Sequence, residues 1–183
     1  MLRIALAAAL AVPPLASHPS HTSLASPMAP TAGGAAVTPV DSAGQLVEVY
    51  AAATARLLES APGETVVLLP TPVGGAAEVA VRARRASGPA LRASATTARQ
   101  VAALLARRGV RGVRGAATGG GRGDAVQLVL GELRYEPGQA PRFARLKIVV
   151  VGTDGARAAM NFLLKKDSAG WTTLNMEAAA SIG

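Results

Sequence analysis

The spacing of apolar residues along the chain predicts two helices and a series of short strands. Over residues 43–60 the apolar positions recur three and four residues apart, which is typical of one helix face. The same spacing over residues 98–108 predicts a second helix, capped by Thr97 with Gln100 and ended by Gly109. Strands are expected where short apolar runs or alternating patterns occur, at residues 65–70, 78–85, 110–116, 125–135, 142–151, 157–165 and 171–178.

Short linkers join the last five of these strands. "EPGQAP", "GTDG" and "DSAG" all have turn composition, and linkers this short connect antiparallel neighbours. "GGGRGD", residues 119–124, is interpreted in the same way, as a hairpin loop between the strands at 110–116 and 125–135. No Gly-Lys-Ser/Thr follows it, as a phosphate-binding loop would require. The Arg-Gly-Asp match is expected by chance in a chain so rich in glycine and arginine.

One strand changes its apolar parity, which predicts a β-bulge. Val126, Leu128 and Leu130 share one parity, whereas Leu133 and Tyr135 share the other, with the switch at Gly131-Glu132. We therefore expect an α+β fold in which a curved antiparallel sheet, ending in a C-terminal meander, packs against two helices. The alternative is a flat sheet whose first strand is buried on both faces.

Residue parity also assigns the faces of the later strands. In the strand at 142–151, Leu146, Ile148 and Val150 are expected to face the core, with Arg145 and Lys147 on the opposite face. In the next strand Met160, Phe162 and Leu164 face inward, and in the last one Leu174 and Met176 do so.

The N-terminus has the pattern of a secretory signal. One arginine precedes the apolar run "IALAAALAV", and two prolines and small residues follow, so residues 1–17 are interpreted as a signal peptide. The run is too short for a membrane-spanning helix, and no transmembrane segment is expected after cleavage. Residues 18–43 are rich in Pro, Ser, Thr and Ala and are interpreted as a disordered tether. Residues 44–183 then form a single domain in a secreted or periplasmic protein.

The residue inventory excludes several chemistries. The chain has no cysteine, and its only histidines, His18 and His21, fall in the predicted tether. The domain therefore lacks the groups for Ser-His-Asp or Cys-His catalysis and for the usual zinc sites. Carboxylates remain at Glu132, Glu136, Asp154, Asp167 and Glu177, but both aspartates lie in turns where aspartate is locally favoured. We expect no catalytic residue, metal or cofactor, and a carboxylate-dependent hydrolase is the weakest alternative.

Arginine supplies the strongest positive signal. The chain has a formal net charge of +8, and residues 82–122 contain ten arginines and no acidic residue. Such a surface attracts anions, so we expect an anionic envelope component, either a lipid headgroup or an acidic polysaccharide, or else a partner protein. Nucleic acid is not expected, because no aromatic residue lies between Tyr50 and Tyr135 to stack on bases. The candidate anion-binding residues are Arg82, Arg84, Arg85, Arg107, Arg108, Arg111 and Arg114.

Two further interpretations of these patterns remain open. The first is that the arginine content reflects codon bias alone, since solvated arginines need no partner. The second is that the domain carries a lipid or another apolar ligand between the sheet and the helices, although the same side chains would serve equally well as core. The candidate residues for that alternative are Leu46, Tyr50, Leu146, Ile148, Met160, Phe162, Trp171 and Leu174.

The C-terminal segment "GTDGARAAMNFLLKKDSAGWTTLNMEAAAS", residues 152–181, resembles the last two strands of small exported domains of the nuclear-transport-factor-like (cystatin-like) kind. These include the periplasmic phospholipid-shuttle (toluene-tolerance) proteins. The shared pattern is a glycine turn, an apolar strand ending in basic residues, and Gly170-Trp171 opening the final strand. The resemblance implies an exported accessory domain, and it implies no functional residue.

Overall fold

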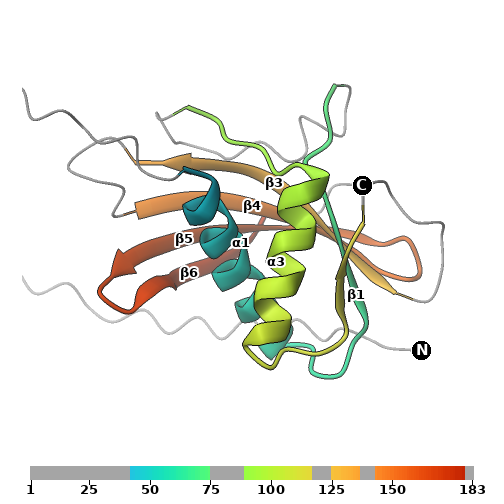
Figure 1. Cartoon of the computed structure of the whole chain (residues 1–183). Helices are drawn as coiled ribbons and strands as arrows, with labels where there is room; N and C mark the ends of the chain where they lie inside the picture. Colours follow the sequence, from blue (N-terminus) through green and yellow to red (C-terminus); the bar gives the residue numbers. More distant parts are fainter. Residues whose placement is uncertain (1–41, 75–88, 117–124, 137–142, 180–183) are drawn as a thin grey trace, which may run out of the picture. The chain divides into compact units, whose positions relative to one another are not determined.

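The computed structural model of the chain describes residues 42–74, 89–116, 125–136 and 143–179, which form two helices over one face of a six-stranded sheet (Figure 1). The elements are α1 (Ser42–Glu59), β1 (Val66–Leu69), α3 (Ala95–Arg107), β2 (Val113–Gly115), β3 (Val126–Tyr135), β4 (Phe143–Val151), β5 (Arg157–Asp167) and β6 (Gly170–Ala179). The strand order is β2-β1-β3-β4-β5-β6, and β3 to β6 form the predicted antiparallel meander. The predicted α+β architecture is confirmed. The predicted signal peptide, most of the tether and the strand at 78–85 lie outside the described residues.

Strand β1 makes the sheet mixed rather than antiparallel throughout. It pairs in parallel with β2 on one side and with β3 on the other. All four of its residues, Val66–Leu69, are buried, as is typical of a parallel strand inside a sheet. Helix α3 links β1 to β2, as parallel neighbours require a crossover connection.

The hairpin interpretation of "GGGRGD" is wrong. Residues 119–124 lie outside the described part of the chain, but the strands that they were expected to join are not neighbours, because β1 lies between β2 and β3. A linker of turn composition can also connect two strands that pair with opposite sides of a third strand. The fully apolar run at residues 66–69 indicated such a buried central strand.

The predicted β-bulge is confirmed. Leu130 pairs with Ile148 and Leu133 pairs with Leu146, so β3 has one more residue than β4 across this interval. The extra residue falls at Gly131-Glu132, where the apolar parity changes. Both leucines therefore reach the core although their parities differ, and the strand bends there.

A second bulge, in β6, overturns one face assignment. Leu163 pairs with Asn175, but the next residue, Leu164, pairs with Thr173, so Leu174 is the extra residue. The expectation that Leu174 faces the core is wrong, because the inserted residue changes the parity and leaves this side chain 54 % exposed. Lys147 also departs from expectation, since it is only 5 % exposed although its parity places it away from Leu146 and Ile148.

Helix α3 begins earlier than the sequence pattern indicates. The Ser94 hydroxyl accepts a hydrogen bond from the Thr97 backbone N–H (3.1 Å), and the Thr97 hydroxyl accepts one from the Ser94 N–H (3.2 Å). The capping box is therefore Ser94 with Thr97, and the predicted pair of Thr97 with Gln100 is wrong. In both pairs the two residues are three positions apart, as a capping box requires. The earlier start adds residues 95–97 to the helix, and of these Thr97 is buried.

Candidate functional site

Four predicted anion-binding arginines follow one another from the C-terminal end of α3 into β2. Arg107 ends the helix, and the backbone N–H of the cap residue Arg108 donates to the carbonyls of Leu104 and Leu105. Gly109 then reverses the chain with a φ of 83°. Cations are favoured at this position because the C-terminal end of a helix carries partial negative charge. Arg111 and Arg114 continue the positive charge along the turn and the strand.

All four side chains are exposed, and none forms an ion pair or side-chain hydrogen bond within the described part of the chain. We refer to Arg107, Arg108, Arg111 and Arg114 as the arginine surface. Arg82, Arg84 and Arg85, the other predicted members, lie outside the described residues, so their part in an anion site stays a prediction.

Other arginines, in contrast, have carboxylate partners. Arg92 reaches Glu132 at 3.5 Å, and Arg134 reaches the second carboxylate oxygen of Glu132 at 3.3 Å. Glu132 is only 2 % exposed, and burying its carboxylate costs solvation energy. The two neighbouring arginines offset part of that cost. Arg92 belongs to the acid-free stretch of sequence, and a partner 40 residues away is invisible to a local charge pattern.

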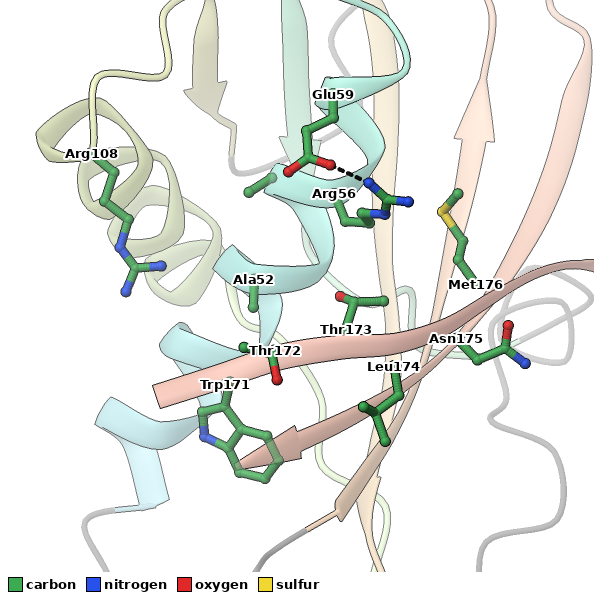
Figure 2. Close-up of a pocket in the computed structure, with 11 residues that line it drawn as sticks. Ala52, Arg56, Glu59, Arg108, Trp171, Thr172, Thr173, Leu174, Asn175 and Met176 are labelled. Carbon is green, nitrogen blue, oxygen red and sulfur yellow. Dashed lines mark hydrogen bonds and ion pairs between the residues drawn. The ribbon is translucent and has the colours of Figure 1, made fainter. Parts of the chain in front are cut away.

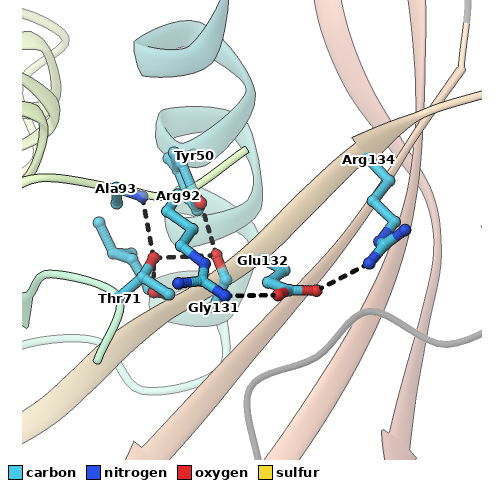
Figure 3. A network of polar contacts seen from close by, with 8 residues as sticks. Tyr50, Thr71, Arg92, Ala93, Gly131, Glu132 and Arg134 are labelled. Carbon is cyan, nitrogen blue, oxygen red and sulfur yellow. Dashed lines mark hydrogen bonds and ion pairs between the residues drawn. The ribbon is translucent and has the colours of Figure 1, made fainter. Parts of the chain in front are cut away.

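Glu132 lies in a polar network around the β3 bulge (Figure 3). The Tyr50 hydroxyl donates to the Gly131 carbonyl (2.5 Å), and the Thr71 hydroxyl donates to the Leu130 carbonyl (2.6 Å). Thr71 also accepts from the Ala93 N–H (2.8 Å). The network thus satisfies carbonyls that the bulge removes from regular strand pairing, and it ties α1 to the segments that flank β1 and α3.

Carboxylates elsewhere also have structural roles. The Asp154 side chain accepts from the Ala156 N–H and the Asp167 side chain from the Ala169 N–H, each at 2.9 Å, as expected for turn aspartates. Glu136 pairs with Arg145. Within the described residues, no group of three or more His, Cys, Asp or Glu side chains is arranged to hold a metal ion.

Most residues proposed for an apolar ligand belong to the core. Tyr50, Leu146, Ile148, Met160 and Phe162 are all buried in one cluster of packed side chains. Leu46 packs against the border of that cluster, whereas Leu174 is exposed at the β6 bulge. Trp171 is buried in the same cluster and also lines a groove.

This groove runs between α1 and the edge strand β6 and has a volume of about 580 Å³ (Figure 2). We call it the edge groove. Ala52, Ala55, Arg56 and Glu59 line it from α1, residues 171–176 from β6, and Arg108 from the end of α3. Arg56 and Glu59 form an ion pair within it. Thr173 and Met176 point toward α1, whereas Leu174 points away from the helix (Figure 2).

Trp171 stacks on Tyr135 with a ring-centroid distance of 5.8 Å. Burial raises the pKa of Tyr135 to about 12, and the Glu48 carboxylate adds to the rise. Burial also raises the pKa of Tyr50. These are the two tyrosines of the chain.

Stability is therefore expected to fall as the pH rises from 10 to 12. Above the unfolded tyrosine pKa of about 10, the unfolded chain releases phenolic protons that the folded protein retains, so the unfolded state is favoured. Ultraviolet absorbance of tyrosinate should stay low in the folded protein at pH 11 and appear together with unfolding, whereas in denaturant it should titrate near pH 10. Reversible titration near pH 10 in the folded protein would contradict the buried placement of these side chains.

Comparison of the chain with protein-family models, curated protein sequences and solved structures finds no match. The resemblance of residues 152–181 to nuclear-transport-factor-like domains therefore stays a prediction. Neither α1 nor α3, the helices of the described part, combines the length and the apolar character that a membrane span needs.

Proposed function

We propose that this chain is an exported, non-enzymatic binding domain that attaches through its arginine surface to an anionic component of the cell envelope. The observation that carries the proposal is the contrast among the described arginines. Arg107, Arg108, Arg111 and Arg114 are exposed without a carboxylate partner and fall within eight consecutive residues, whereas Arg56, Arg92, Arg134 and Arg145 are paired. Arg99 and Arg157, the other described arginines without a carboxylate partner, stand apart from this group in the sequence.

The physical basis is the field of adjacent like charges. Exposed cations that are not neutralised by their own protein attract anionic surfaces, at about 1 kcal/mol per arginine near an anionic membrane. The guanidinium fork also binds phosphate and carboxylate groups with two parallel hydrogen bonds. Either a phospholipid headgroup or an acidic polysaccharide offers these groups.

Removing two charges from the arginine surface should weaken binding to vesicles rich in phosphatidylglycerol by more than about tenfold. The test variant is Arg111→Gln/Arg114→Gln. The matched control is Arg56→Gln/Arg145→Gln, which lowers the net charge equally but removes arginines that already have carboxylate partners. Vesicle co-sedimentation at low and high salt measures both variants, and wild-type binding should weaken steeply with salt.

Parallel measurements with phosphatidylcholine vesicles and with an acidic polysaccharide identify the source of the anion. If both double variants lose vesicle affinity equally, the effect is one of net charge alone and the proposal is overturned. Binding that is insensitive to salt would overturn it as well. Retention of polysaccharide binding without vesicle binding would assign the site to polysaccharide.

Carriage of an apolar ligand is the alternative, and the mutual packing of Tyr50, Leu146, Met160 and Phe162 supports core filling instead. Native mass spectrometry of gently purified protein, with lipid analysis of an organic extract, separates the two functions. A stoichiometric lipid would favour the carrier.

A further inference from the structure

Strand β6 forms one edge of the sheet over ten residues, Gly170–Ala179. Its N–H and C=O groups pair with β5 on one side, and within the described residues no strand pairs with its other side. Free edges of this length invite another strand, so proteins usually shorten, cover or charge them. The opposite edge is the three-residue strand β2.

The side chains along β6 do little to block pairing. Leu174 is exposed at the bulge, with the uncharged Thr172 and Asn175 beside it, and Glu177 is the single charged residue of the strand. With 54 % of its surface exposed, Leu174 contributes only part of its apolar surface to the packing of its own domain. A strand that pairs with β6 would cover the exposed part of this side chain.

Strand β6 can pair antiparallel with β6 of a second copy so that residues opposite each other lie on the same face of the joined sheet. With the two-fold axis between Leu174 and Asn175, these two residues lie opposite each other across the pair, and Met176 lies opposite Thr173. Met176 and Thr173 both point toward α1 (Figure 2), as opposed residues on a shared face must. The two exposed Leu174 side chains then meet near the axis.

The same register also pairs opposite charges. It places Glu177 opposite Thr172 of the second copy, and Thr172 in turn pairs with Lys165 on β5. Because adjacent strands lie about 5 Å apart, Lys165 is about 10 Å from Glu177 between Cα atoms, within the combined reach of the two side chains over the small Thr172. Lys165 is exposed and has no ion-pair partner in the described part of the chain.

We propose that the β6 edge is a self-association surface on which two copies of this chain join their sheets antiparallel about Leu174 and Asn175, with Lys165 of each copy bound to Glu177 of the other. Sedimentation equilibrium of the mature protein over a range of concentrations should show a monomer–dimer equilibrium. Leu174→Lys, which places a charge at the axis, should weaken the dimer by at least about tenfold.

A charge exchange tests the register. Glu177→Lys and Lys165→Glu should each weaken the dimer by about tenfold, because each places like charges together, and the double variant should restore wild-type association. Arg157→Glu is the control on β5, since Arg157 is exposed at the far end of that strand and should leave association unchanged. Melting curves verify that each variant is folded.

Several results would overturn the proposal. A wild-type protein that stays monomeric at all concentrations would leave the β6 edge to another occupant, such as an extended segment of a different protein. A dimer that is indifferent to Leu174→Lys would use another surface. If both single variants weaken the dimer and the double variant does not restore it, the proposed register is wrong.

Discussion

A valine in place of Gly115 is expected to lower the free energy of unfolding by about 3 kcal/mol. The backbone of Gly115 in β2 lies directly against α3 at Ala98 and Arg99. A Cβ atom added at this position would stand 2.6 Å from the Cα and backbone N of Arg99 and 2.7 Å from the carbonyl carbon of Ala98. These are main-chain atoms of a helix, so they cannot rotate away as a side chain would.

Chemical denaturation of the variant measures the loss. Arg114→Val is the matched control, because it adds the same side chain to the same strand at an exposed position, where substitutions change stability by about 0.5 kcal/mol or less. Gly115→Ala should fall between the two. A Gly115→Val protein as stable as the control would show that β2 and α3 separate at little cost, contrary to the close contact described.

Truncation of Leu146 to alanine is expected to cost about 3 kcal/mol of stability as well. Leu146 is 1 % exposed in the centre of the sheet, where it pairs with Leu133 on β3 and Phe162 on β5. Its neighbours on both sides are held in strand register, so they relax only partially into the cavity that the truncation leaves.

The measurement is again the midpoint of chemical denaturation, with an unchanged slope as evidence that both states keep their compactness. Val73→Ala is the control, since Val73 is exposed and its truncation removes apolar atoms already in contact with water. Similar small losses in both variants would mean that Leu146 is not part of a close-packed core.

The spacing of apolar residues predicted those helices and strands whose apolar positions do face the core. Helix α1 was expected at residues 43–60 and runs from Ser42 to Glu59. The β3 bulge was predictable because an extra residue must shift the apolar parity, and β3 has enough apolar residues on either side of Gly131 to display the shift. The meander was predictable because its linkers are short.

Features that depend on residues distant in the sequence were not predictable in this way. The parallel pairing of β1 depends on strands that follow it by more than 40 residues. The β6 bulge left no sign in the pattern, because Leu174 is an apolar residue that merely continues an apparent alternation. An apolar residue can face outward, so parity alone does not locate a bulge there.

The arginine surface was recognised from composition, and the structure separates its members more finely than composition can. Arg92 and Arg111 look alike in the acid-free stretch, but Arg92 binds the buried Glu132. Charge patterns report residues near one another in sequence, whereas this ion pair depends on the segment before α3, which the bridge between Leu91 and Leu133 holds against β3. The edge groove was not predicted, because its two walls come from opposite ends of the domain.

Because α1 and β6 come from opposite ends of the domain, their contact also sets the order in which the domain can fold. Helix α1 rests on β6, so the first described element is completed by the last, and the apolar face of α1 has no full covering until residue 179 has been synthesised. Contacts of such long range close slowly and late. We therefore expect the domain to complete its folding only after β6 has been synthesised.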